Sequence, residues 1–194
     1  AGNLATTQSV ISLLEERNKA PTDRGPSIME APSMFQVARL VGDTLREVIQ
    51  RNSDVGQKAD ATFHATFIVG GQIHGSEPRL FLIYPEGNFI EASRDTPYFQ
   101  IGETKYGRPI MLRAYDADLS WEAAIKLLLI SFDSTVKANL SVGLPLDMLA
   151  YQKDSFECMY RHRITSEDPY FLSVSNGWRE ALKSAFDQLP DFKF

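Results

Sequence analysis

Few residues of this sequence have the types and spacing that a reaction centre needs. Asp116 and Asp118 place two carboxylates close together, as general acid and base catalysis could require. They stand just before a predicted helix, however, where side-chain oxygens commonly accept the first backbone N–H groups. We therefore interpret both as capping residues. The one cysteine, Cys158, rules out an internal disulfide framework or a zinc site built from cysteines.

The charge and hydropathy of the chain exclude several classes of protein. Its 194 residues include 20 basic and 25 acidic side chains, and the net charge of −5 gives no basic surface for a dedicated nucleic-acid binder. The longest apolar run, Leu80 to Tyr84, is far shorter than the ~20 residues of a membrane span. We expect no nucleic-acid partner, no membrane partner, and no metal or organic cofactor. A single thiol favours a reducing compartment, so we expect the protein to be cytoplasmic.

Apolar residues recurring every three to four positions predict helices. The first covers 6–17 and is followed by an irregular segment over 20–32. Ser33 and Gln36 have the spacing of a capping box in front of the next, strongly periodic helix. Two more helices are expected, a short one beginning at Pro109 and a final one from about Asn176.

Segment 120–138 predicts the most apolar helix of the chain. Apolar side chains cover most of its circumference, and the polar residues form one narrow stripe of Glu122, Lys126, Asp133 and Lys137. A helix that is apolar on so many sides must be buried on most of them. We expect it to lie between a sheet and either another layer or a second subunit.

Alternation with a period of two predicts strands. Phe63 to Val69 alternate in this way, and Leu80–Tyr84 and Phe89–Ala92 flank a Pro-Glu-Gly-Asn hairpin turn. We expect 98–101 to continue this sheet. Two further strands are predicted over 146–153 and 160–164. Helices placed outside antiparallel strands indicate an α+β layered sandwich.

Four blocks of sequence resemble proteasome β-type subunits, which are N-terminal-nucleophile (Ntn) hydrolases. Ala1-Gly2-Asn3-Leu4-Ala5-Thr6-Thr7-Gln8 resembles the small-residue turn that opens their first helix. Segments 99–107, 131–143 and 146–151 resemble their strand-to-helix segment, their long helix with a Ser-Gly turn, and the strand beyond it. Together with the loop at 20–32, the blocks are most similar to the bacterial Anbu (ancestral β-subunit) proteins. The resemblance covers essentially the whole chain, and it implies one αββα layered domain over 1–194.

The resemblance also implies an activity, amide hydrolysis by an N-terminal threonine. The threonine hydroxyl attacks the carbonyl, and its own α-amine or a lysine takes the proton. In the family the nucleophile, an aspartate and the activating lysine precede the turn at Gly2, whereas Ala1 has no nucleophilic side chain. We therefore expect a proteasome-like subunit without its first strands, acting on peptide or peptide-like substrates. The family also implies self-assembly of identical subunits into a ring or an open spiral.

By resemblance, five residues have roles near the threonine. Gly2 matches the glycine whose backbone N–H points into the oxyanion hole, and Leu4 matches a residue of the specificity pocket. Ser141 matches the serine that supports the threonine amine. The acidic partner expected three residues before it is absent, and Asn139 is the nearest polar substitute. Glu103 replaces a family serine, and its carboxylate would raise the pKa of the amine and weaken it as a base.

These departures predict weak or altered hydrolysis and leave two alternatives open. The chain could be a non-catalytic scaffold subunit of a proteasome-like assembly, as the α-type subunits of the same fold are. It could also be a different Ntn amidase that acts on small acyl amides. The mature N-terminus of the natural protein separates an enzyme from the scaffold, because only a free nucleophilic residue there permits the threonine mechanism. The proteasome-like order of the sequence blocks disfavours the other amidase.

Overall fold

The computed structural model describes residues 1–19, 25–56 and 62–194, so the first part of the predicted irregular segment at 20–32 lies outside the described residues. The chain divides into two compact units, 1–102 and 103–194. Each unit combines helices with antiparallel strands, which confirms the predicted α+β class. Among the described helices, none has the length and apolar character needed to traverse a bilayer.

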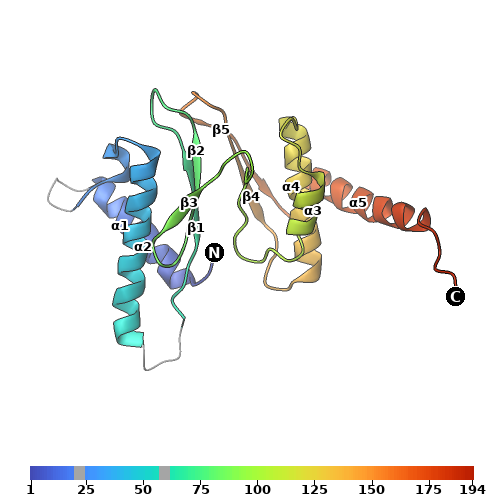
Figure 1. Ribbon diagram of the computed structural model, residues 1–194, viewed down its shortest axis with the longest axis horizontal. Coiled ribbons are helices and arrows are strands. Elements are labelled where there is room, and N and C mark those ends of the chain that lie inside the picture. The colour runs from blue at the N-terminus through green and yellow to red at the C-terminus, as the bar shows by residue number, and fades with distance from the viewer. Residues whose placement is uncertain (20–24, 57–61) are drawn as a thin grey trace. The chain divides into compact units, whose positions relative to one another are not determined.

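The first unit contains two long helices and a three-stranded sheet. The strands pair antiparallel in the order β1-β2-β3, and both long helices lie to one side of the sheet (Figure 1). Its elements are α1 (Leu4–Lys19), the 3-10 helix η1 (Ile28–Glu30), α2 (Met34–Gly56), β1 (Phe67–Gly71), β2 (Arg79–Ile83) and β3 (Phe89–Glu91). One hydrophobic core joins the two long helices and the sheet. Its buried residues include Val10 and Leu14 of α1, Val41 and Leu45 of α2, and Phe81 and Ile83 of β2.

Local signals in the sequence explain how α2 meets the hairpin. Ser33 Oγ accepts the backbone N–H of Gln36 at 3.2 Å, as expected for the first half of the capping box. The predicted hairpin turn forms between β2 and β3, where Gly87 has a φ of 86° that glycine adopts most easily. Gly42 of α2 packs directly on this turn, and a Cβ atom at Gly42 would overlap the carbonyl oxygen of Gly87. Two glycines therefore let the helix and the hairpin approach closely.

The predicted strands of this unit need two corrections. The strand expected from Phe63 begins only at Phe67, and Ala65 forms an isolated bridge with Gly2 instead. The strand expected at 98–101 is wrong, because the described chain has no strand there. After β3, a tight turn between Ser93 and Thr96 redirects the chain, and the proline that follows has no N–H for a ladder.

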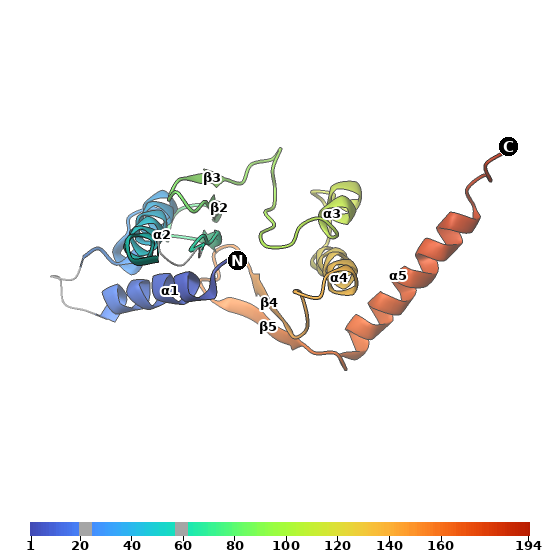
Figure 2. The ribbon, with the colours of Figure 1, turned by 90° about the horizontal axis from the view of Figure 1, so that it is seen from below.

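The second unit contains three helices and a two-stranded antiparallel sheet. Its elements are α3 (Arg108–Ala114), α4 (Trp121–Ala138), β4 (Leu146–Tyr151), β5 (Cys158–Ile164) and α5 (Pro169–Asp187). Leu129 of α4, Ile164 of β5 and Phe171 of α5 form the centre of its core. Figure 2 shows that α5 starts near the end of β5 and then extends away from α4.

The helix starts of this unit differ from two predictions. Asp116 and Asp118 do not cap α4: the Oγ of Ser120 accepts the N–H of Ala123, and Asp116 accepts the Asp118 N–H in a turn before it. The last helix begins at Pro169, several residues before the predicted start. Asp168 caps it, so a capping residue followed by proline was the signal that apolar periodicity alone overlooked.

The polar stripe predicted on α4 is also wrong in one respect. Asp133 is buried, and Lys137 Nζ lies 3.1 Å from its Oδ1 and donates to Ser175 Oγ of α5 at 2.6 Å. The C-terminal end of the polar stripe therefore faces α5, whereas the rest of the stripe and the apolar Leu128 and Phe132 are exposed in this chain. Along this part of the helix a carboxylate is buried while two apolar side chains are exposed. The buried carboxylate is tolerated because it pairs with Lys137, which also donates to Ser175.

Candidate functional site

Three of the five predicted site residues form one hydrogen-bonded network in the second unit. Asn139 Nδ2 donates to Glu103 Oε2 at 2.8 Å. Asn139 Oδ1 accepts both the backbone N–H of Ser141, at 2.8 Å, and its hydroxyl, at 2.7 Å. Asn139 thus connects a carboxylate with a serine hydroxyl. We refer to Glu103, Asn139 and Ser141 as the polar network.

Secondary structure places the polar network. Asn139 is the C-terminal capping residue of α4, and its backbone N–H donates to the Thr135 carbonyl. Ser141 follows in the turn after the helix, while Glu103 precedes α3 and also accepts the Lys105 N–H at 2.9 Å. The Ser141 hydroxyl donates a hydrogen bond to Asn139 Oδ1, so its own oxygen keeps lone pairs that can accept a bond from an ammonium or amine.

Gly2 has the conformation and surroundings that an exposed backbone donor needs. It forms a bridge with Ala65 whose two hydrogen bonds use the neighbouring Ala1 carbonyl and Asn3 N–H. In such an antiparallel pair, the N–H of the bridged residue points away from the partner segment. Gly2 also has a φ of 110°, and a Cβ there would lie 2.5 Å from the His64 carbonyl oxygen. Only glycine fits this turn without displacement of the backbone.

The start of α1 adds a favourable field at this turn. Asn3 Oδ1 accepts the Thr6 N–H at 3.0 Å, and the helix begins at Leu4. Negative charge is favoured at a helix N-terminus, because the first N–H groups and the helix dipole point toward it. Leu4 itself is 69% exposed, so its side chain is not part of the core of the described chain. Gly2 and Leu4 belong to the first unit, so a cleft shared with Ser141 stays a prediction.

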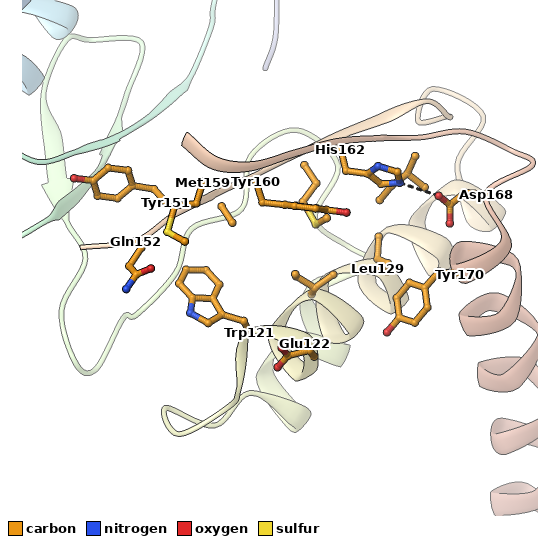
Figure 3. Close-up of a pocket in the computed structure, with 14 residues that line it drawn as sticks. Trp121, Glu122, Leu129, Tyr151, Gln152, Met159, Tyr160, His162, Asp168 and Tyr170 are labelled. Atoms are coloured by element: carbon orange, nitrogen blue, oxygen red, sulfur yellow. Dashed lines mark hydrogen bonds and ion pairs between the residues drawn. The ribbon is translucent and has the colours of Figure 1, made fainter. Parts of the chain in front are cut away.

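A cavity of about 780 Å³ between α4 and the β4–β5 sheet was not predicted from the sequence. Figure 3 shows Trp121 of α4 and Tyr160 of β5 on opposite walls. The signal was present in the spacing: most of the lining residues on α4 are four apart, and most of those on β5 are two apart. These residues are Trp121, Ile125 and Leu129 on α4, and Tyr160, His162 and Ile164 on β5.

The cavity has a polar corner. His162 Nε2 and Asp168 Oδ2 are 2.9 Å apart, and Asp168 also accepts the Phe171 N–H as the cap of α5 (Figure 3). The hydrogen bond from His162, followed by that from Phe171, holds the pKa of the Asp168 carboxyl below its ordinary value. Across the described ranges, no three His, Cys, Asp or Glu side chains are arranged to share a metal ion. The corner thus fixes the start of α5 against β5.

No family model matches the sequence, and no curated protein matches it. Solved structures do match over the whole chain. Anbu (ancestral β-subunit) from Yersinia bercovieri is 50% identical, with a TM-score of 0.90 and 79% of that chain covered. Anbu from Hyphomicrobium sp. strain MC1 is 47% identical, with a TM-score of 0.89 and 79% covered. The helical assembly of the Anbu complex from Pseudomonas aeruginosa is 43% identical, with a TM-score of 0.92 and 78% covered. This identity over the full chain shows that it belongs to the Anbu (ancestral β-subunit) family, as the sequence resemblance indicated.

Proposed function

We propose that the chain is a subunit of a self-assembling, proteasome-like peptidase that uses an N-terminal threonine. The polar network is the observation that carries the proposal. Glu103 and Asn139 are 36 residues apart in sequence, yet they share a hydrogen bond, and Asn139 holds Ser141 in turn. Three residues assigned by resemblance to the surroundings of one amine are thus neighbours in space.

In the proposed reaction, the threonine hydroxyl oxygen forms a bond with the substrate carbonyl carbon, and its proton passes to the amine. The oxygen of the tetrahedral intermediate accepts the Gly2 N–H, and the dipole of α1 stabilises its charge. The C–N bond then breaks as the proton moves to the leaving amine. Water hydrolyses the resulting ester, which restores the hydroxyl. Ser141 accepts a bond from the threonine ammonium or amine and orients it, while Leu4 contacts the substrate side chain.

Glu103 sets this site apart from ordinary proteasome subunits. A carboxylate beside the threonine amine stabilises its protonated form, so the amine becomes a weaker base at neutral pH. Asn139 moderates this effect, because it occupies Glu103 Oε2 with a hydrogen bond. We therefore propose weak or altered hydrolysis of peptide or peptide-like amides by the intact protein.

The layered αββα sandwich of Ntn hydrolases is part of the same proposal. The match covers only 78–79% of the relatives' chains, so each relative has further residues beyond the matched part. A two-stranded sheet is marginally stable by itself, and β4–β5 is paired with no other strand in the described part of the chain. Additional strands beside β4 or β5 would extend this sheet and cover the apolar cavity. We place the nucleophile on such strands.

Self-assembly has support from a relative and from α4. A Pseudomonas aeruginosa relative forms a helical assembly. In the present chain, α4 also exposes Leu128 and Phe132, and we propose that a neighbouring subunit covers them. We propose assembly into a ring or an open spiral, in a cytoplasmic protein without a nucleic-acid or membrane partner.

Intact-mass analysis and N-terminal sequencing of the natural protein, together with a fluorogenic peptide assay, test the proposal. We expect a mature N-terminal threonine upstream of Ala1 and slow turnover by that form. The chain from Ala1 to Phe194 alone should turn over no peptide. A natural start at Ala1 would leave only the scaffold alternative, and hydrolysis by the chain alone would place the nucleophile elsewhere.

Replacing Asn139 with alanine tests the positioning role of the polar network. Asn139→Ala removes three hydrogen bonds, to Glu103 and to the hydroxyl and backbone N–H of Ser141, each worth about 0.5–1.5 kcal/mol. We expect kcat of the full-length protein to fall by roughly tenfold, because about 1.4 kcal/mol corresponds to a factor of ten. KM should change little, and the melting temperature should fall by only a few degrees, since the side chain is partly buried and water replaces some of the lost bonds.

Asn176→Ala provides the matched control, because Asn176 is exposed on α5. Its kcat should equal that of the unmodified protein. A kcat for Asn139→Ala that stays within twofold of the control would contradict the positioning role. A lower melting temperature with unchanged kcat would instead show that the network serves only the fold.

A further inference from the structure

The two halves of α5 have different surroundings. Phe171 and Ser175 in the first half are buried, and Val174 packs on the core of the second unit. From Arg179 to the end of the chain, every residue is exposed. Figure 1 and Figure 2 both show this part of α5 projecting beyond α4. The second half of the helix therefore receives no support from the rest of its unit.

This exposed half has one apolar face. At 100° per residue, side chains three and four positions apart share a face, and an apolar stripe of this kind is typical of a helix that packs against a partner. Phe186 on the helix is 76% exposed, and Leu189, in the turn just after the helix ends at Asp187, is 67% exposed. The tail after the helix carries two more aromatic rings, whose centroids are 5.1 Å apart. We define the α5 face as Ala181, Leu182, Ala185, Phe186, Leu189, Phe192 and Phe194.

The area of the α5 face matches what a stable interface needs. An aromatic side chain can bury ~150–250 Å², so the three phenylalanines together offer roughly 500 Å². The two leucines add to this, which brings the total near the ~800 Å² that each partner contributes to a standard protein interface. Apolar patches of this size on soluble proteins are commonly binding sites.

We propose that the α5 face docks on a second copy of this chain and joins neighbouring subunits of the assembly. This inference rests on the proposed self-assembly, and it identifies one of the surfaces responsible. The helical assembly of a relative that is 43% identical makes a second copy the favoured occupant. Helical assemblies arise from head-to-tail contacts, in which one surface meets a different surface of the next subunit. The exposed half of α5 then serves as an arm that reaches the neighbouring subunit.

The charged side of the same segment remains in solvent in this arrangement. Glu180 has ion pairs with Arg179 at 3.0 Å and with Lys183 at 3.6 Å, all three largely exposed. Lys183 and Asp187 lie on the side of the helix away from the α5 face. These charges keep the arm hydrated on one side, so burial of the other side selects a defined orientation of the helix.

Sedimentation velocity on the full-length protein tests the inference with two double variants. Phe186→Ser with Leu189→Ser removes two exposed apolar side chains, and Lys183→Ser with Asp187→Ser is the matched control on the opposite side. Both variants carry two serines in the same segment and keep the same net charge as the unmodified protein. We expect the first variant to assemble on the order of 100-fold more weakly, as is typical when central interface residues are truncated. The control should assemble normally, and circular dichroism at a concentration where all three proteins are monomeric should show the same melting temperature.

Each of the other possible results contradicts a different part of the proposal. If the unmodified protein assembles and the Phe186/Leu189 variant assembles equally well, the α5 face is not an interface, while the proposed assembly stands. If the unmodified protein is a monomer at micromolar concentration, the proposed assembly fails, and this inference fails with it. A lower melting temperature of the variant at a concentration where the unmodified protein is also monomeric would place the α5 face against its own chain.

Discussion

Gly2→Ala is expected to lower kcat for peptide hydrolysis by the full-length protein by roughly 10²–10³-fold, the usual effect of losing one oxyanion donor. The cause is steric. An added Cβ would lie 2.5 Å from the His64 carbonyl oxygen and 3.0 Å from Ala65 Cα, and both are backbone atoms that cannot rotate aside. The φ of 110° adds strain for any residue other than glycine. The turn must therefore move, and the Gly2 N–H moves with it.

The kinetic constants show whether this donor acts in the transition state. Loss of an interaction that forms only there lowers kcat and leaves KM nearly unchanged. Gly177→Ala is the control, because Gly177 lies on α5 and a Cβ there has no neighbour within 4 Å. Turnover by Gly2→Ala at the level of this control would remove Gly2 from the proposed oxyanion hole. A matching loss of assembly would show instead that the change unfolds the first unit.

Gly42→Ala should reduce the free energy of unfolding by about 3 kcal/mol, at the upper end of typical overpacking costs. Alanine in the middle of a helix is ordinarily better than glycine by roughly 1 kcal/mol, so the contact must outweigh propensity. The contact outweighs propensity because the new Cβ would overlap the Gly87 carbonyl oxygen. The packing is equally close from the other side, since a Cβ added to Gly87 would lie 2.7 Å from the Gly42 carbonyl oxygen. Neither backbone can yield without separating α2 from the hairpin.

Thermal unfolding measures this effect. For a chain of this size, 1 kcal/mol corresponds to about 2–4 °C, so Gly42→Ala should lower the melting temperature by ~6–12 °C. Gly177→Ala again serves as the reference, and here it should raise stability slightly, since it changes a helical glycine in open space. Equal melting temperatures for the two variants would show that α2 and the hairpin can separate at little cost.

Helices and strands with strong periodicity were predictable from the sequence. The spacing of apolar residues in α2 and α4 defined both helices to within a residue or two at their starts, because burial of one face dominates their stability. The hairpin between β2 and β3 followed from its turn residues, since few dipeptides suit a tight reversal. The strand predicted at 98–101 failed because a short apolar run carries no information about its partner.

Only part of the candidate site was predictable from the sequence. The residue types of Gly2, Glu103, Asn139 and Ser141, and their resemblance to a family, were readable from the sequence. The hydrogen bonds that join Glu103 to Asn139 and Asn139 to Ser141 were not, because they link segments that only the fold brings together. The apolar cavity beside α4 was missed for the same reason, since its walls come from two helices and two strands.

The sequence by itself determined the α+β class, most helix and strand positions, and membership in the Anbu family, because these depend on local periodicity and on residue identity along the chain. Tertiary structure decided which side of α4 is buried, that Lys137 also meets Ser175 of α5, and that the second half of α5 has no partner in its unit. The physical reason is that burial and pairing depend on what each face meets in space, and an amphipathic pattern specifies a face without specifying its partner.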